Sequence, residues 1–372
     1  MKKAHWNILI IALLTAALLC GCGTPSAPAK AEGGETAGET AEAAVETAAP
    51  TPMVKVREVS YDDGASLTLE YNGGGQLTRA VFTLADGRSL VEEREYAERS
   101  LSKLTITHPD GEVTAAEDIR EGDRGYTAGR VTGTAPDGKS YVIEIPEGGE
   151  PVLSVSGITL DGRNREQNAE GETIRELCNS TFSSEVIKHE YENSKLCLSA
   201  YIDCTELSLN LYELSENGET SRRYYNGRCG EISVEEYNSN GDVVRVTRYE
   251  GYDKSLTYDS EYDDAGTLIR TVESRETESD LLVGARDMDA FKRPVKSTIT
   301  ENGKPTLVFE MEYLTDAEGE FACTANCYDA EGELLGQLID HGGYSEVDFG
   351  EWYSTSADPE KVRNTYYLIG RG

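Results

Sequence analysis

The feature that most constrains the fold of this chain is the alternation of apolar and polar residues in short runs. Apolar side chains occupy every second position in residues 67–71, 104–106, 196–202, 207–211 and 307–313. A period of two over several residues is typical of β-strands with one face toward solvent. The alternation therefore predicts many short strands.

Glycines that follow Asp or Asn separate these runs and predict the turns. The pairs lie at 63–64, 86–87, 110–111, 137–138, 217–218, 240–241 and 302–303. Such pairs favour type I′ hairpin turns, in which both central residues have positive φ. Turn glycines at 64, 87 and 111, and again at 218, 241 and 266, lie 23 to 25 residues apart, which fits a two-strand repeat. We predict a mainly β fold, either an antiparallel hairpin meander or an extended sheet of repeats, with at most one or two short helices.

Several turns begin with tyrosine, and this pattern resembles the YD repeat of RHS-type bacterial surface proteins. The repeat reads Tyr-Asp, two residues and Gly, followed by a short strand. Residues 237–241, 262–266 and 328–332 match its spacing, and residues 61–64 are one residue short. The resemblance covers about residues 230–335, and more faintly 55–145, and it implies an extended sheet of hairpins. A generic antiparallel meander would give a similar pattern. The family's long spirals can enclose a toxin, but this chain is too short for a shell, so no toxin activity is inferred.

Composition divides the chain into six segments. They are a signal peptide (1–21), a disordered Ala/Glu/Thr/Pro linker (22–52), a β subdomain (53–156), a loop or short helix (157–180), a YD-repeat-like β subdomain (181–354) and a C-terminal tail (355–372). Residues 163–177 lack alternation, which predicts a loop or one short helix. Residues 356–366 are a second helix candidate, because Pro359 suits a first helical turn.

The N-terminus carries the parts of an export signal. Lys2 and Lys3 precede an apolar core, residues 8–19, that is too short to span a bilayer. The core ends in Leu-Cys-Gly-Cys, which resembles the bacterial lipobox, although Cys20 is unusual at its position. The resemblance implies that Cys22 is acylated, so we expect an extracytoplasmic protein held on the bacterial cell membrane by this lipid. The alternatives are an ordinary cleaved signal and an uncleaved anchor.

The charge of the chain limits its partners. It has 35 Lys and Arg against 68 Asp and Glu, a formal net charge of −33. Nucleic acid and anionic lipid headgroups are therefore disfavoured, because like charges repel. Calcium or a basic partner is compatible with the charge. However, the nearest match to a calcium loop, residues 236–247, ends in Thr247 instead of a bidentate Glu and indicates a hairpin turn. We expect no cofactor and assign no metal ligand.

The cysteines beyond the lipobox fall into two groups. One or two disulfides fit an exported protein in the first group, with the connectivity open: Cys178, Cys197, Cys204 and Cys229. Cys323 and Cys327 would share one face of a strand about 13 Å apart, which is too far for a disulfide. We predict that these two are buried thiols.

The sequence contains one match to a nucleotide-binding motif and none to two common hydrolase motifs. Residues 133–140 match the P-loop pattern G-x-x-x-x-G-K-[ST], but 136–138 indicate a turn and 141–145 a strand, whereas a P-loop opens a helix. We predict no nucleotide affinity. Neither G-x-S-x-G nor H-E-x-x-H occurs. Of His108, His189 and His341, only the last has a setting that suggests a site, and a turn explains it equally well. No catalytic residue is assigned.

Tyrosines recur in a stretch without histidine, at 237, 249, 252, 258, 262, 313 and 328. Tyrosine combines contact area with a hydrogen-bonding tip, and it also packs well between strands. Tyr237, Tyr258, Tyr262 and Tyr328 are the candidate binding residues. The function favoured by the sequence is a non-enzymatic surface lipoprotein whose hairpins bind a protein or glycan or support the envelope. The alternative is an exported carbohydrate-active enzyme or accessory that uses dispersed carboxylates and tyrosines.

Overall fold

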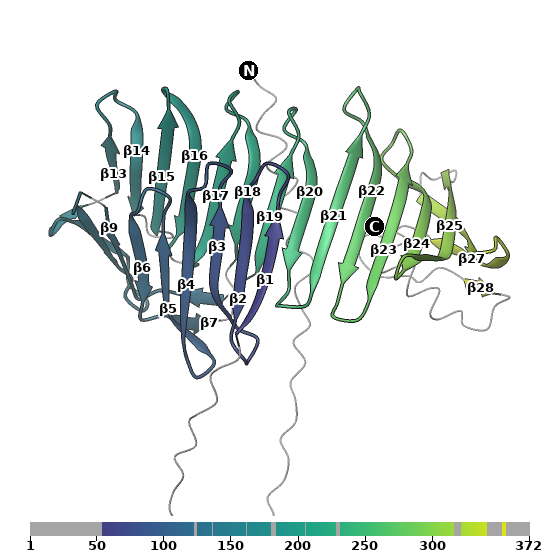
Figure 1. Cartoon of the computed structure of the whole chain (residues 1–372), viewed down its shortest axis with the longest axis horizontal. Coiled ribbons are helices and arrows are strands. Elements are labelled where there is room, and N and C mark those ends of the chain that lie inside the picture. Colours follow the sequence, from purple (N-terminus) through teal and green to yellow (C-terminus); the bar gives the residue numbers. More distant parts are fainter. Residues whose placement is uncertain are drawn as a thin grey trace, which may run out of the picture. The chain divides into compact units, whose positions relative to one another are not determined.

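The computed structural model describes residues 54–122, 125–135, 137–160, 162–179, 184–204, 206–227, 231–315, 321–340 and 352–354. This part of the chain contains β-strands and no helix, and its strands form antiparallel sheets in which neighbours in sequence are almost always neighbours in space (Figure 1). The predicted mainly β, antiparallel fold is confirmed. The signal peptide, the linker, Cys22, Cys229, His341 and the helix candidate at 356–366 lie outside the described residues.

The first sheet has ten strands. In spatial order they are β1 (Lys55–Ser60), β2 (Ser66–Tyr71), β3 (Leu77–Thr83), β4 (Ser89–Ala97), β5 (Ser100–Thr107), β6 (Val113–Glu117), β9 (Arg130–Thr134), β10 (Ser140–Glu144), β11 (Val152–Val155) and β12 (Ile158–Leu160). A separate small hairpin interrupts this order between β6 and β9. It consists of β7 (Arg120–Gly122) and β8 (Gly125–Thr127).

The second sheet has sixteen strands, also in chain order. They are β13 (Arg163–Gln167), β14 (Thr173–Asn179), β15 (Ser184–Glu192), β16 (Lys195–Asp203), β17 (Ser208–Leu214), β18 (Thr220–Asn226), β19 (Ile232–Tyr237), β20 (Val243–Tyr249), β21 (Ser255–Tyr262), β22 (Leu268–Glu276), β23 (Leu281–Met288), β24 (Pro294–Glu301), β25 (Lys304–Thr315), β26 (Phe321–Asp329), β27 (Leu334–Asp340) and β28 (Trp352–Ser354).

The prediction of a loop or short helix at 157–180 is wrong, because most of this segment forms β12, β13 and β14. Residues 163–167 form the polar edge strand of the second sheet. In β14 the alternation is hidden because a buried position is filled by Arg175, which pairs with the Glu112 carboxylate at 3.1 Å. A buried ion pair thus takes the place of an apolar residue.

The predicted turns exist, but most have another backbone geometry. At the first of them, Gly64 N donates to Tyr61 O (3.1 Å) and Tyr61 N donates to Ala65 O (2.9 Å), and only the glycine has positive φ. This is a three-residue loop that consists of a type I turn and a glycine in the left-handed region. Of the seven predicted pairs, only Asn302-Gly303 has positive φ at both residues, at 50° and 79°, as type I′ requires.

Buried side chains of both sheets form one hydrophobic core between them. Phe82 of β3 stacks on Tyr224 of β18 with ring centroids 5.4 Å apart, and both side chains are fully buried. Such a pair contributes about 0.5–1.5 kcal/mol beyond its buried area. The face of the second sheet that carries Val186, Tyr224 and Val234 is called here the inner face, and its opposite the outer face.

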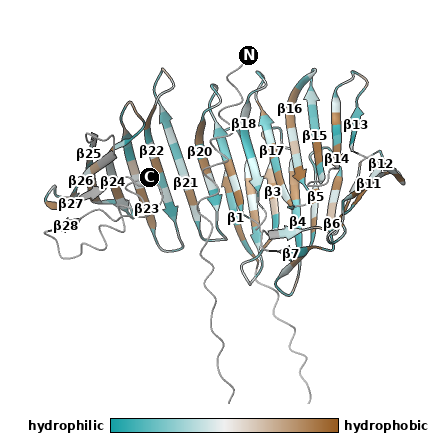
Figure 2. Cartoon of the chain, turned by 180° about the vertical axis from the view of Figure 1, so that it is seen from behind, coloured by the Kyte–Doolittle hydropathy of each residue, from teal (hydrophilic) through white to brown (hydrophobic). Residues whose placement is uncertain are grey.

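Beyond β20 the core of the second sheet changes sides. Side chains of directly paired residues share a face, and one such row lies on the outer face: Glu235, Val246, Tyr258, Glu273, Gly284, Ile299 and Leu307. Ile299 and Leu307 belong to a second buried cluster, with Phe309 of β25 and Ala325 of β26. The second cluster therefore lies on the outer face. Figure 2 shows apolar and polar segments alternating along the strands.

Candidate functional site

Four consecutive strands of the second sheet each place one tyrosine on the outer face. Tyr201 of β16, Tyr212 of β17, Tyr225 of β18 and Tyr237 of β19 alternate with the inner-face residues of the same strands. The register pairs Tyr201 with Asn210 and Asn210 with Tyr225, and it pairs Tyr212 with Arg223 and Arg223 with Glu235. These seven residues are called here the tyrosine face.

Arg223 lies at the centre of the tyrosine face. Its Nε and Nη2 donate to Asn210 Oδ1 at 2.9 and 2.6 Å, and its Nη1 donates to the Glu235 carboxylate at 3.1 and 3.2 Å. The guanidinium carbon lies 5.7 Å from the ring centroid of Tyr212 and 5.0 Å from that of Tyr225. One side chain thus fixes two rings, an amide and a carboxylate, at the distances of cation–π contacts and charge-assisted hydrogen bonds.

Electrostatics keep Arg223 charged and the Tyr237 hydroxyl protonated. Burial disfavours the charge of Arg223, but Glu235 outweighs it and the pKa of Arg223 is raised. Tyr237 Oη donates to Glu235 Oε2 at 2.5 Å. Burial first, and the Glu235 charge second, raise the pKa of Tyr237, so its hydroxyl stays protonated. The tyrosines are half-buried, and the side chains of Arg223 and Glu235 are 23% and 13% exposed. The face therefore presents rigid rings at little further cost in side-chain entropy.

The structure separates the four tyrosines predicted from the sequence. Tyr237, Tyr258 and Tyr262 lie on the outer face, all half-buried. Tyr328 is paired with Val308 and lies on the inner side of β26. Tyr201 and the other members of the tyrosine face on β16–β18 were not predicted from the sequence. The signal that could have found them was their position, because they alternate along each strand with the apolar residues that face the core.

Some tyrosines have a structural role that repeats along the chain. Tyr96, Tyr262 and Tyr313 donate their hydroxyls to the backbone carbonyls of Leu77 (2.8 Å), Val243 (3.1 Å) and Pro294 (2.6 Å). Each donor follows its acceptor by 19 residues, and each acceptor is the first residue of a strand. The hydroxyl of Tyr262 is therefore engaged within the sheet.

Carboxylates that cluster between the two sheets are paired with basic residues. Lys188 of β15 lies 2.6 Å from Asp110 and 3.1 Å from Glu112, which lie in the turn between β5 and β6 of the first sheet. Arg222 of β18 contacts Asp63 at 3.0 Å and Glu213 at 3.2 Å. These contacts join the sheets through charges as well as through the core.

A third cluster between the sheets is almost fully buried. Arg94 Nε donates to Glu92 at 2.5 Å, and its Nη2 donates to Asn226 Oδ1 of β18 at 2.6 Å. Asn226 also donates to Glu92. Glu92 is 0% exposed and Asn226 1%. The three side chains satisfy one another away from water.

The rejected motifs have structural explanations. β9 ends at Thr134, Gly138 N donates to Ala135 O (2.9 Å) in a turn, and β10 begins at Ser140, so the predicted turn and strand are confirmed. A Cβ on Gly133 would lie 2.0 Å from the Tyr141 ring, so this glycine makes room for an aromatic side chain. Asn238 to Asp242 form the predicted hairpin turn between β19 and β20. Among the residues that the structure describes, no group of three or more His, Cys, Asp or Glu is placed to hold a metal ion.

Of the two described histidines, one directly follows β5 and the other lies on β15. His108 is buried, and its Nε2 lies 3.2 Å from the Thr114 hydroxyl, which is 3.0 Å from the Tyr141 hydroxyl. Burial, and then the charge of Lys188, lower the pKa of His108 to about 3. His189 lies on β15 with Nδ1 3.0 Å from the Ser199 hydroxyl.

The expected disulfides are absent among Cys178, Cys197 and Cys204, which are free thiols. Cys197 lies on β16 and Cys204 directly follows it, so these two residues are about 23 Å apart along the strand. Cys178 lies on β14, two strands away, whereas a disulfide needs Cα atoms within about 7 Å. Cys323 and Cys327 are buried, as predicted.

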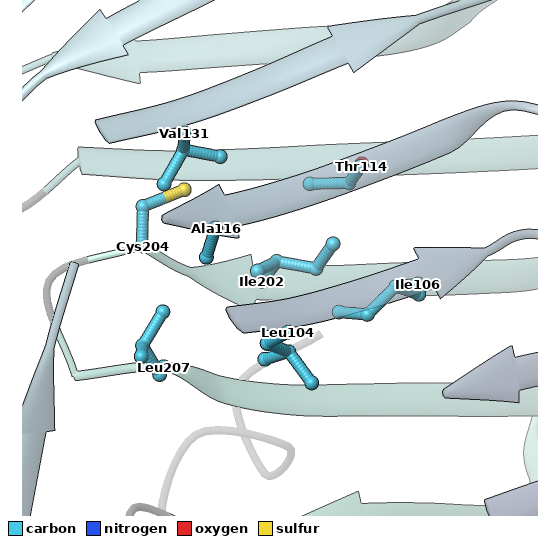
Figure 3. A pocket seen from close by; sticks show the side chains of 8 residues that line it. All are labelled: Leu104, Ile106, Thr114, Ala116, Val131, Ile202, Cys204 and Leu207. Atoms are coloured by element: carbon cyan, nitrogen blue, oxygen red, sulfur yellow. The ribbon is translucent and has the colours of Figure 1, made fainter. Parts of the chain in front are cut away.

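A small cavity lies between the two sheets, within the core. Its volume is about 10 Å³, and Leu104, Ile106 and Val131 of the first sheet face Ile202 and Leu207 of the second across it (Figure 3). A cavity of this volume holds one water at most, and its lining is almost entirely apolar. It is a packing void and not a ligand site.

Comparison with known proteins does not place the chain in a family. No family model matches it. No curated protein matches its sequence. Among solved structures it is similar to one described as a porin-like protein from Bacteroides uniformis ATCC 8492, with 13% identity, 67% of this chain and 94% of that chain covered, and a TM-score of 0.16. A likeness at that level supports no argument about function. The described residues include no helix of the length and apolarity that a membrane span needs.

Proposed function

We propose that this protein is a non-enzymatic binding protein of the bacterial cell surface, held on the membrane by a lipid at Cys22. The observation that supports binding is the tyrosine face, in which Arg223 immobilises Tyr212, Tyr225, Asn210 and Glu235 on an outer sheet surface. The composition Tyr, Asn, Arg and Glu provides large rigid rings and adaptable hydrogen bonds, which is the chemistry of recognition surfaces.

The attachment rests on the lipobox-like residues 19–22 and the apolar core before them. The linker predicted from the composition of the 30 residues after Cys22 would span roughly 30 Å as a flexible chain, which would let a folded domain clear the lipid surface. Replacing Cys22 by Ser should move the protein from the membrane fraction to the soluble fraction. Unchanged retention in the membrane would contradict the attachment.

The binding role is tested with the full chain carrying Cys22→Ser, so that it is soluble. It is mixed with cell envelopes from the bacterium that makes it, and the fraction that sediments with them is measured. Tyr212→Ala with Tyr225→Ala should lower this fraction at least fivefold. Tyr328→Ala is the matched control, because it removes a half-buried tyrosine from the opposite side of the sheet.

Two outcomes would count against the binding role. Equal sedimentation of the wild type and the double variant, with both folded by circular dichroism, would rule out the tyrosine face as the binding surface. An equal loss in the Tyr328→Ala control would show that the effect is structural.

A further inference from the structure

We infer that the ligand of the tyrosine face is a neutral polysaccharide chain. This rests on the proposed function and specifies its ligand by chemical class. Three features of the outer face lead to it: its charge balance, its lack of an exposed apolar anchor, and the spacing of its rings.

The charge balance disfavours an anionic ligand. Arg223 is the cation among the seven residues of the face, and three of its nitrogens are engaged by Asn210 and Glu235. Arg223 therefore neutralises Glu235 and has no pair of parallel N–H groups left to bind a carboxylate, sulfate or phosphate. The chain as a whole carries a formal charge of −33, which repels anionic polymers.

The face also has no freely projecting anchor for a protein partner. Hot spots of protein interfaces are often Tyr, Trp or Arg side chains that the partner buries in a pocket, whereas the four tyrosines here are half-buried in their own sheet and the Arg223 side chain is 23% exposed. The described large apolar residues that are well exposed, such as Ile158, Phe291 and Leu334, lie outside β16–β19. The outer face of β16–β19 instead combines rings with hydroxyl, amide and carboxylate groups.

The spacing of the rings fits a repeating ligand. Tyr201 and Tyr225 lie in one cross-strand row with Asn210 between them, so their strands are about 10 Å apart. Tyr212 and Tyr237 add rings on the alternate strands, β17 and β19. A pyranose presents C–H groups on its faces and hydroxyls at its rim. Rings can contact the faces, while the Glu235 carboxylate, in addition to its bonds with Arg223 and Tyr237, can accept from hydroxyls at the rim.

The test is affinity electrophoresis of the full chain with Cys22→Ser in gels that contain one polysaccharide each. The neutral probes are glucomannan, mixed-linkage β-glucan and α-mannan, and the anionic probe is polygalacturonate. We expect retardation by at least one neutral probe and none by polygalacturonate. Tyr212→Ala with Tyr225→Ala should raise the Kd for that probe at least tenfold, or about 1.4 kcal/mol. Phe at both positions should keep it within threefold, because the rings remain, and Tyr328→Ala should leave it unchanged.

The outcomes separate the inference from the proposed function. If no neutral probe retards the protein but the double alanine variant still loses sedimentation with envelopes, the face binds another class of ligand and the polysaccharide inference is wrong. Stronger retardation by polygalacturonate would overturn it as well. If the double variant changes neither retardation nor sedimentation, both the inference and the proposed function fail.

Discussion

Replacing Glu92 by glutamine tests how the two sheets are joined. Glu92 is 0% exposed and lies 2.5 Å from Arg94, whose side chain is only 7% exposed. Glutamine keeps the shape and can still accept one hydrogen bond, but it leaves the guanidinium charge buried without a counterion. Removing one partner of a buried ion pair costs about 3–5 kcal/mol. Because one hydrogen bond is retained, we expect a loss near the lower limit, about 3 kcal/mol.

The assay is urea unfolding of the full chain with Cys22→Ser, read as the change in midpoint at constant slope. Glu95→Gln is the matched control, because Glu95 is 69% exposed and lies 3.7 Å from Lys103. An exposed pair of this kind contributes at most about 1 kcal/mol. A loss below about 1 kcal/mol for Glu92→Gln would refute the reasoning, since it would mean that water reaches the Arg94 charge.

Three further predictions concern single positions. The pKa of His108 falls from 6.5 to about 3 on folding because of burial and Lys188. Between these two pH values His108 binds a proton in the unfolded chain but not in the folded chain. Stability should therefore be full above pH 6.5 and fall by about 1.4 kcal/mol per unit below it, and His108→Gln should flatten this slope in urea midpoints at pH 7, 6 and 5. Gly133→Ala should lower stability by about 1–3 kcal/mol or more, because its methyl group meets the Tyr141 ring, and ATP should leave the thermal melting of both forms unchanged. Lys292 holds φ at 61° where the other described turns with the same pair of backbone hydrogen bonds have glycine, so Lys292→Gly should raise the free energy of unfolding by about 1 kcal/mol.

The sequence predicted the strands wherever the apolar half of a strand faces a core. Leu67 and Leu69 of β2, and Phe309 and Met311 of β25, occupy buried alternate positions as expected. The prediction failed at β14, where Arg175 fills a buried position. Its counterion, Glu112, lies in the other sheet and far away in sequence. Local periodicity carries no information about such a partner.

The candidate site was predictable only in part. Tyr237 was chosen for its place in a Tyr-Asn turn pattern, whereas Tyr212 and Tyr225 lie within strands and have no such signal. Their exposure depends on which face the first sheet covers. That choice follows from contacts such as Phe82 with Tyr224, which join distant parts of the sequence. Residue type suggested recognition, but the grouping around Arg223 required the register of four strands.

The change of side between the two clusters leaves β21 and β22 as the strands that connect them, since Leu282 of β23 already packs against the second cluster. No described residue belongs to both clusters, and in β21 most side chains are half-buried, with cross-strand contacts such as Thr247 with Thr257 at 3.3 Å. A distortion of one cluster can therefore affect the other mainly by changing the twist of these strands, because their backbone hydrogen bonds connect the two clusters. We expect their amides to exchange with solvent faster than those of β16–β18, because fewer buried contacts resist their opening. The second sheet would then consist of two rigid parts connected by strands that twist more easily.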